Sequence, residues 1–326
     1  MEDKAYLAAT FVASIGFIFF DAGWVISMPL LCLPGTVLGT LLQGYCLVVS
    51  LRYHNTFAVY LQLSMFLWIV GNVLWAWSEL IWPTPAGVLA NVSFFATLDV
   101  RFRTPVMIAG LTALVGSVAV LMVAYIRYWL NMRRYVLENG NPGVRELQFN
   151  PYYDETVSDA SVEYIVDEPN RLMYLLPFII ADTLWEVGDF LEESFLALPD
   201  GSPIILALAC SILLLGALSV AKGCQAVLAD VRAAMYGNAL MLAADLLWVL
   251  TNVIWGASDV TSNLLGEELN CALSWIYVGL FTISGVGMCV ALFVKNREHP
   301  ASANHASASA LLSPSGLRSR RSSSSM

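Results

Sequence analysis

Four short units in this chain place an acidic or amide side chain three residues before a tryptophan, each inside an apolar stretch. The units begin at Asp21, Asn72, Asp182 and Asn252, and their tryptophans are Trp24, Trp75, Trp185 and Trp255. Three of the units add an acid seven residues after their first position, at Glu79, Asp189 and Asp259. Positions separated by three and seven residues share one helix face, and in a membrane such a face must point toward protein or water.

Asp245 extends the polar face of the last unit by seven residues, so that it runs from Asp245 through Asn252 to Asp259 over about 21 Å. We expect Asp182 and Asp245 to lie nearest the middle of the membrane. A carboxylate at that depth costs at least ~2.5 kcal/mol unless it is protonated, paired or hydrated. No Lys or Arg stands at a comparable depth, so a proton, a cation, water or a neutral hydrogen-bond donor must stabilise these acids.

This chemistry predicts a site for a small cation or a solute inside the protein. Its predicted binding residues are Asp21, Asn72, Asp182, Asn252, Asp245 and Glu186, and its outer acidic access route is Glu79, Asp189 and Asp259. An alternative for the access route is a helix whose outer third has emerged into water. An alternative for the four units is that Trp anchors at the membrane interface while Asp and Asn join neighbouring helices by hydrogen bonds.

The composition identifies the elements that must position these residues. Apolar residues make up 58% of 326 positions and charged residues 13%, against about half and a quarter in a typical soluble domain. Windows long enough to cross a bilayer occur near 7–28, 30–50, 57–82, 106–126, 172–191, 203–221, 233–257 and 272–294. Asp21 and the acidic start Glu2-Asp3 argue against a cleaved signal peptide. The sequence therefore predicts an all-α polytopic membrane protein with eight transmembrane helices.

Internal similarity divides these helices into two copies. Residues 17–21 align with 178–182, and 68–75 align more closely with 248–255. Four helices per copy give both copies the same orientation, so we predict a parallel 4+4 repeat built from four hairpins. The predicted domains are a first membrane repeat at 1–126, an acidic, Tyr-rich cytosolic linker at 127–171, a second repeat at 172–294 and a disordered, Ser-rich cytosolic tail at 295–326.

Basic residues predict the orientation in the membrane. With both termini in the cytosol, fourteen of the sixteen Lys and Arg residues lie inside, and only Arg101 and Arg103 lie outside. Much of the net charge of −9 then collects on the outer face, where it disfavours nucleic acid. The sequence does not distinguish the plasma membrane from an endomembrane.

Three local motifs give secondary predictions. Asn91-Val92-Ser93 is a glycosylation acceptor in a predicted outer loop. Asn150–Tyr153 has the Asn-Pro-x-Tyr form of a sorting signal that would bind a cytosolic adaptor, and its alternative is an ordinary proline turn. Cys32 and Cys271 are both expected near the outer side, so the sequence neither predicts nor excludes a disulfide between them.

Several enzyme classes do not fit the sequence. The histidines are His54, His299 and His305, all outside the predicted helices, so a membrane-embedded His metal site or a Ser/His/Asp triad is excluded. No phosphate-binding Gly-Lys loop is present. An aspartyl intramembrane protease would have to use Asp182 and Asp245 without the flanking residues of that class. We therefore expect no enzymatic activity, no metal and no cofactor.

The predicted hairpins show a repeated pattern of small and aromatic residues, as in Ser14–Phe19 followed by Gly39–Gly44. This pattern resembles the YrhK-like two-helix membrane unit, and four such units would cover all four hairpins. The resemblance implies a membrane hairpin without a well-defined activity, so it assigns no site residues.

Two functions are compatible with these observations. The first is permeation of a small cation or a proton-coupled solute through a polar centre formed by the odd-numbered helices. The second is a scaffold or sensor that acts through its cytosolic linker and tail. Permeation requires Asp21, Asn72, Asp182 and Asn252 to face one shared polar cavity, whereas a scaffold predicts pairwise polar contacts inside a closed bundle.

Overall fold

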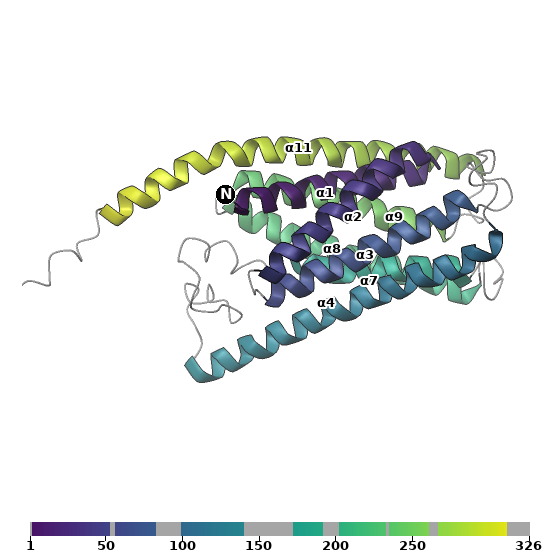
Figure 1. The fold of residues 1–326 in the computed structure, drawn as a ribbon, viewed down its shortest axis with the longest axis horizontal. Helices are drawn as coiled ribbons and strands as arrows, with labels where there is room; N and C mark the ends of the chain where they lie inside the picture. The colour runs from purple at the N-terminus through teal and green to yellow at the C-terminus, as the bar shows by residue number, and fades with distance from the viewer. Residues whose placement is uncertain are drawn as a thin grey trace, which may run out of the picture.

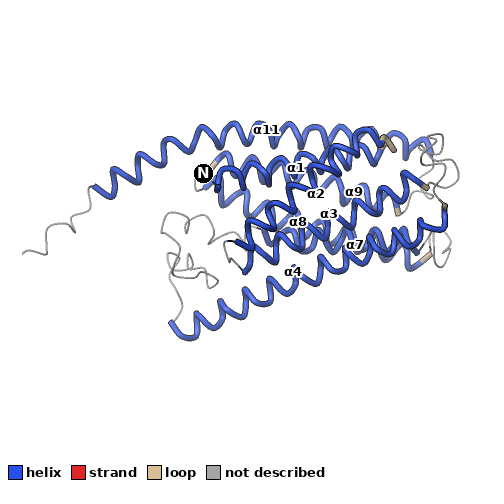
Figure 2. The backbone as a smooth tube through the Cα atoms, viewed as in Figure 1, coloured by secondary structure: helices blue, strands red, loops and turns tan. Residues whose placement is uncertain are grey.

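The computed structural model describes residues 2–52, 56–82, 99–139, 172–191, 202–232, 235–260 and 267–311. Within these ranges the chain is helical and contains no β-strand (Figure 2). The long helices are α1 (Glu2–Val25), α2 (Pro29–Arg52), α3 (Thr56–Ile81), α4 (Arg103–Asn139), α7 (Leu175–Phe190), α8 (Pro203–Arg232), α9 (Tyr236–Asp259) and α11 (Glu267–Leu311). Two short 3-10 helices, η2 (Val100–Phe102) and η3 (Leu172–Tyr174), precede α4 and α7.

Six described helical segments are long and apolar enough to cross a membrane, and they lie in α2, α3, α4, α8, α9 and α11. The apolar part of α1, Ala9–Val25, is shorter, and α7 has 16 residues, or about 24 Å of rise. Most of the described side chains of both helices are nevertheless buried. The prediction of an all-α fold is confirmed within the described residues, and its six long apolar helices are compatible with a multi-pass membrane protein, whereas the eight spans and the 4+4 repeat stay predictions.

Two helices continue beyond the predicted membrane segments. α4 extends to Asn139, past the predicted boundary at residue 126, and α11 extends to Leu311, past residue 294. Hydropathy marks only the part of a helix that is apolar enough for lipid, whereas good helix formers carry the helix further. The alanines at every second or third position from Ala301 onward explain helix in a segment whose composition predicted disorder.

Close packing of small residues holds adjacent helices together. A Cβ at Gly35 of α2 would stand 2.3 Å from the carbonyl oxygen of Gly16 in α1, so only glycine allows this approach. Gly71 of α3 and Gly110 of α4 meet in the same manner, with a Cβ 3.0 Å from the facing carbonyl oxygen. Small residues that bring helix backbones together are typical of packing inside membranes.

Reciprocal contacts join the two groups of four helices. α1 packs against α11, and α4 packs against α7. The start of α1 and the end of α11 lie at the same end of the bundle, which we call the terminal end (Figure 1). The opposite end, where α1, α3, α7 and α9 all finish, is called the far end. Asp99 caps η2 there, and hydrogen bonds from Arg101 lower the pKa of the Asp99 carboxyl.

Candidate functional site

Asp182 of α7 is held by two donors from α3. The indole Nε1 of Trp68 donates to Asp182 Oδ2 at 2.7 Å, and the amide Nδ2 of Asn72 donates to the same oxygen at 3.0 Å. Asn72 Nδ2 also lies 3.1 Å from the carbonyl oxygen of Trp68, which orients the amide. Asp182 is 5% exposed, so both hydrogen bonds lie inside the bundle.

Asp21 of α1 has the same environment on the other side of the bundle. Trp248 Nε1 donates to Asp21 Oδ2 at 2.6 Å, and Asn252 Nδ2 donates to that oxygen at 3.2 Å. Asn252 Nδ2 is again fixed by the carbonyl oxygen of the tryptophan four residues earlier, at 3.1 Å. Both donors come from α9, so each acid accepts hydrogen bonds from the opposite half of the chain.

An aromatic cluster connects the two acid sites. It consists of Phe17, Trp68, Phe178 and Trp248, with ring centroids 4.8 to 6.3 Å apart. The two tryptophans of the cluster are the indole donors, and their rings meet edge to face at 5.6 Å. Tilted and edge-to-face contacts are the favourable geometries for such rings. The cluster therefore packs both indole donors against one another and against a phenylalanine from each acid's own helix.

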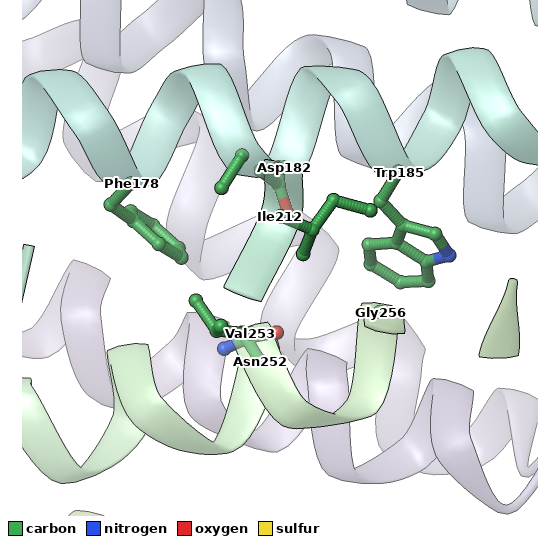
Figure 3. A pocket seen from close by; sticks show the side chains of 8 residues that line it. Phe178, Asp182, Trp185, Ile212, Asn252, Val253 and Gly256 are labelled. Carbon is green, nitrogen blue, oxygen red and sulfur yellow. The ribbon is translucent and has the colours of Figure 1, made fainter. Parts of the chain in front are cut away.

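Asp182 and Asn252 face each other across a narrow space between α7, α8 and α9. Figure 3 shows Phe178, Asp182 and Trp185 on α7 along one side of it, and Asn252, Val253 and Gly256 on α9 along the other. The space is too narrow to accept a water-sized sphere. In this conformation the centre is therefore closed, and its polar groups meet in pairs.

Carboxylates form a second layer toward the far end. Trp24 Nε1 and Trp75 Nε1 each donate to a different oxygen of Glu79 at 2.7 Å. Trp75 Nε1 also lies 3.1 Å from Asp189 Oδ2, and Trp185 Nε1 donates to Asp259 at 3.0 Å. These tryptophans are at most 5% exposed. They are interior hydrogen-bond donors, and the interhelical Asp–Asn hydrogen bonds expected in the alternative for the four units are present at Asp21 and Asp182.

Glu186 lies between the two layers and differs from every other acid of the site. Its side chain is fully buried, and neither carboxyl oxygen has a hydrogen-bond partner. Glu79, Asp182, Asp189 and Asp259 are all close enough to interact electrostatically with it. A buried carboxyl without a donor is costly, because it loses its hydration and gains nothing in return.

Asp245 is the site residue that stands apart. It is half-buried in α9, one turn before Trp248, and it accepts a hydrogen bond from the hydroxyl of Tyr174. The backbone carbonyl of Tyr174 accepts from Ser219 at 2.7 Å, so η3, α8 and α9 are joined at this point. Sequence reasoning grouped Asp245 with Asp182, whereas the structure places Asp21 in the environment equivalent to that of Asp182.

The structure brings together eight of the nine predicted binding and access residues, with Asp245 at the terminal side of the group. Sequence reasoning missed the donors Trp68 and Trp248, although each stands four residues before a predicted site Asn. The missed signal is therefore the Trp-x-x-x-Asn spacing. No group of three His, Cys, Asp or Glu side chains in the described ranges is arranged to hold a metal ion.

Three secondary predictions are not resolved by this geometry. Asn91 and Asn150–Tyr153 lie outside the described residues. The thiol of Cys32 is buried and free, and it donates to the carbonyl oxygen of Phe20 at 3.5 Å. The side chain of Cys271 lies outside the described set.

The apolar helices and their buried acid-rich centre define the class: this is a helical protein whose segments are suited to crossing a membrane several times. Comparison of the chain with protein-family models, with curated proteins and with solved structures gave no match. The functional argument consequently depends on the residues of the site alone.

Proposed function

We propose that this protein allows a small cation or a proton-coupled solute to cross a membrane through the polar centre formed by α1, α3, α7 and α9. One observation carries the proposal. Asp21, Asp182 and Glu186 are buried in the interior, and no basic side chain in the described part of the chain forms an ion pair with them. Intramembrane acids of this kind mark ion and proton pathways in membrane proteins.

The arrangement of the acids along the bundle supports passage rather than a single isolated site. Asp245 lies toward the terminal end, Asp21 and Asp182 lie in the centre and Glu186 follows toward the far end. Glu79, Asp189 and Asp259 continue the series to the far end, where Asp259 is exposed. Carboxylates with neutral donors can exchange a cation or a proton, whereas carboxylates in salt bridges are already neutralised.

The proposal includes eight spans in four hairpins, with both termini in the cytosol and the far end outside. The equivalent surroundings of Asp21 and Asp182 support a parallel duplication of four helices. The reciprocal packing of α1 on α11 and of α7 on α4 agrees with it, because two related units exchange equivalent contacts.

A second candidate function is a membrane scaffold or sensor that acts through its linker and tail. It is favoured by the pairwise contacts of Asp21 with Asn252 and of Asp182 with Asn72, which join helices across a closed centre. Interhelical hydrogen bonds of this kind stabilise membrane bundles by under ~1 kcal/mol each. The described conformation therefore has the pairwise contacts in a closed bundle that were expected of a scaffold, and the permeation proposal requires a second conformation in which the centre opens.

Flux measurements separate the two functions. The purified chain in sealed vesicles should dissipate a proton gradient, or a gradient of one cation from a panel, faster than protein-free vesicles do. A rate equal to that of protein-free vesicles for every gradient in the panel would favour the scaffold and end the permeation proposal.

A further inference from the structure

Glu186 breaks the equivalence of the two halves. The alignment of Asp21-Ala-Gly-Trp24 with Asp182-Thr-Leu-Trp185 places Val25 at the position that corresponds to Glu186. The acid is therefore present in the second half alone. The first half folds around an apolar side chain at this position, so the architecture itself does not need a carboxyl there.

The surroundings of Glu186 offer it no structural role. It is 0% exposed, and both of its oxygens lack a hydrogen-bond partner, whereas the neighbouring acids accept from tryptophan or asparagine. The described charged groups that act on it are Asp182 and Asp189 on its own helix, Glu79 on α3 and Asp259 on α9. All four are acids, so they repel a negative charge on Glu186 and favour a positive ion beside it.

The kind of ion follows from the available ligands. Ca²⁺ takes six to eight oxygen ligands and Mg²⁺ requires an octahedral set, so both need room and several converging oxygens. No set of three acidic, Cys or His side chains within the described ranges converges in this manner. A proton needs only one carboxyl oxygen and no coordination shell.

We propose that Glu186 is an exchangeable proton-binding site, loaded from the far end through the acids that surround it. This inference deepens the proposed function, because it names the proton as the ion that the centre handles. The exposure of the acids falls from Asp259, which is exposed, through the half-buried Glu79 and Asp189 to the buried Glu186. Chains of acids with this gradation are typical of proton relays. One proton from water converts the Glu186 carboxylate into the neutral acid, and its release restores the carboxylate.

Infrared difference spectroscopy of the reconstituted full chain tests the site without any measurement of transport. The parent protein should show the carbonyl stretch of a buried carboxylic acid, with an amplitude that changes as the pH is stepped and a frequency that shifts in D₂O. Glu186→Gln should remove the Glu186 component of this band and leave the components of the other buried acids. The control is Asp99→Asn, since Asp99 is partly exposed, is bonded to Arg101 and lies outside the acid group, and it should leave the band intact.

A stability measurement gives a second test, which applies even if Glu186→Gln fails to fold. Glu186→Val installs the side chain of the equivalent position in the first half and removes a carboxyl without a donor. We expect a higher unfolding temperature in detergent together with loss of the Glu186 component of the pH-dependent band. A lower unfolding temperature would contradict the absence of a structural role for this acid.

The outcomes separate this inference from the proposed function. A pH-dependent Glu186 band in a protein without any flux would retain the proton site and end the permeation proposal. A band that Glu186→Gln leaves unchanged, or one whose amplitude is constant at every pH, would overturn the proton site even if flux is present.

Discussion

At the scale of single residues, the centre of this protein is built from acids that accept hydrogen bonds from uncharged donors. An indole and an amide from one helix converge on one oxygen of Asp182, and an equivalent pair converges on Asp21. Trp is an effective donor here because its N–H is carried on a large apolar ring that packs well in a dry interior. The arrangement stabilises a carboxyl inside the bundle without a basic partner.

Removal of one donor should be costly at both acids. Trp68→Phe and Trp248→Phe each leave a buried carboxyl oxygen without its shortest hydrogen bond, and we expect the free energy of unfolding to fall by about 1–3 kcal/mol. Equilibrium unfolding in detergent measures this change. Trp275→Phe is the matched control, since Trp275 is 64% exposed, and it should have little effect. Losses no larger than that of the control would contradict the importance of the two donors.

The site was only partly predictable from the sequence at this scale. Spacings of three and seven residues placed Asp21, Asn72, Asp182 and Asn252 on interior faces, and the structure brings those faces together. Periodicity reports which face of a helix is polar, but it carries no information about which distant helix supplies the partner. The donors Trp68 and Trp248, and the absence of any donor to Glu186, therefore became visible only in the structure.

At the scale of helices, the fold depends on a few close approaches between neighbouring elements. α1 and α2 are joined by a tight turn that ends at Met28, where Ser27 has a φ of 50°. Pro29 begins α2 directly after this turn, and the helix continues through Pro34. Proline suits the first turn of a helix because a backbone N–H has no partner inside the helix at that position. Further along α2, Gly35 contacts α1.

Gly35→Ala should disrupt the packing of α1 on α2. Its Cβ would stand 2.3 Å from the backbone oxygen of Gly16 and 2.6 Å from the Cβ of Phe20, so the helices must separate. We expect the free energy of unfolding to fall by about 1–3 kcal/mol, as for other overpacked interiors. Gly279→Ala is the control, because a Cβ there meets nothing within 4 Å, and it should leave stability unchanged or raise it. Equal effects of the two substitutions on thermal unfolding would argue against this contact.

At the scale of the whole molecule, the first four and the last four long helices make matching contacts. Asp21 of α1 accepts a hydrogen bond from α9, and Asp182 of α7 accepts one from α3. In the same way, α1 packs against α11 and α7 packs against α4. Hydropathy was sufficient to predict an all-helical chain, and six of its described helices are long and apolar enough to cross a membrane. It could not predict the ends of α4 and α11, because these continue as helices after the apolar segment ends.

The proposed orientation has a direct test. A tag after Met326 should be inaccessible from outside in intact cells and become accessible once the plasma membrane is permeabilised. For a protein retained in an inner membrane, selective permeabilisation of the plasma membrane alone should already expose the tag. The physical reason is the cost of moving fourteen basic residues to the outer side instead of two. Labelling of the tag in intact cells, or protection of the tag until inner membranes are opened, would contradict the orientation.

The central claim is that the buried acids carry an ion or a proton through the middle of the bundle, and flux through variants of Asp182 and Asp21 tests it most directly. Asp182→Asn and Asp21→Asn keep the size of the side chain and its ability to accept from Trp and Asn, so both should fold. Each should abolish the cation- or proton-driven flux of the parent protein in reconstituted vesicles, whereas Asp182→Glu should retain part of it. Parental flux in both Asn variants would contradict the account.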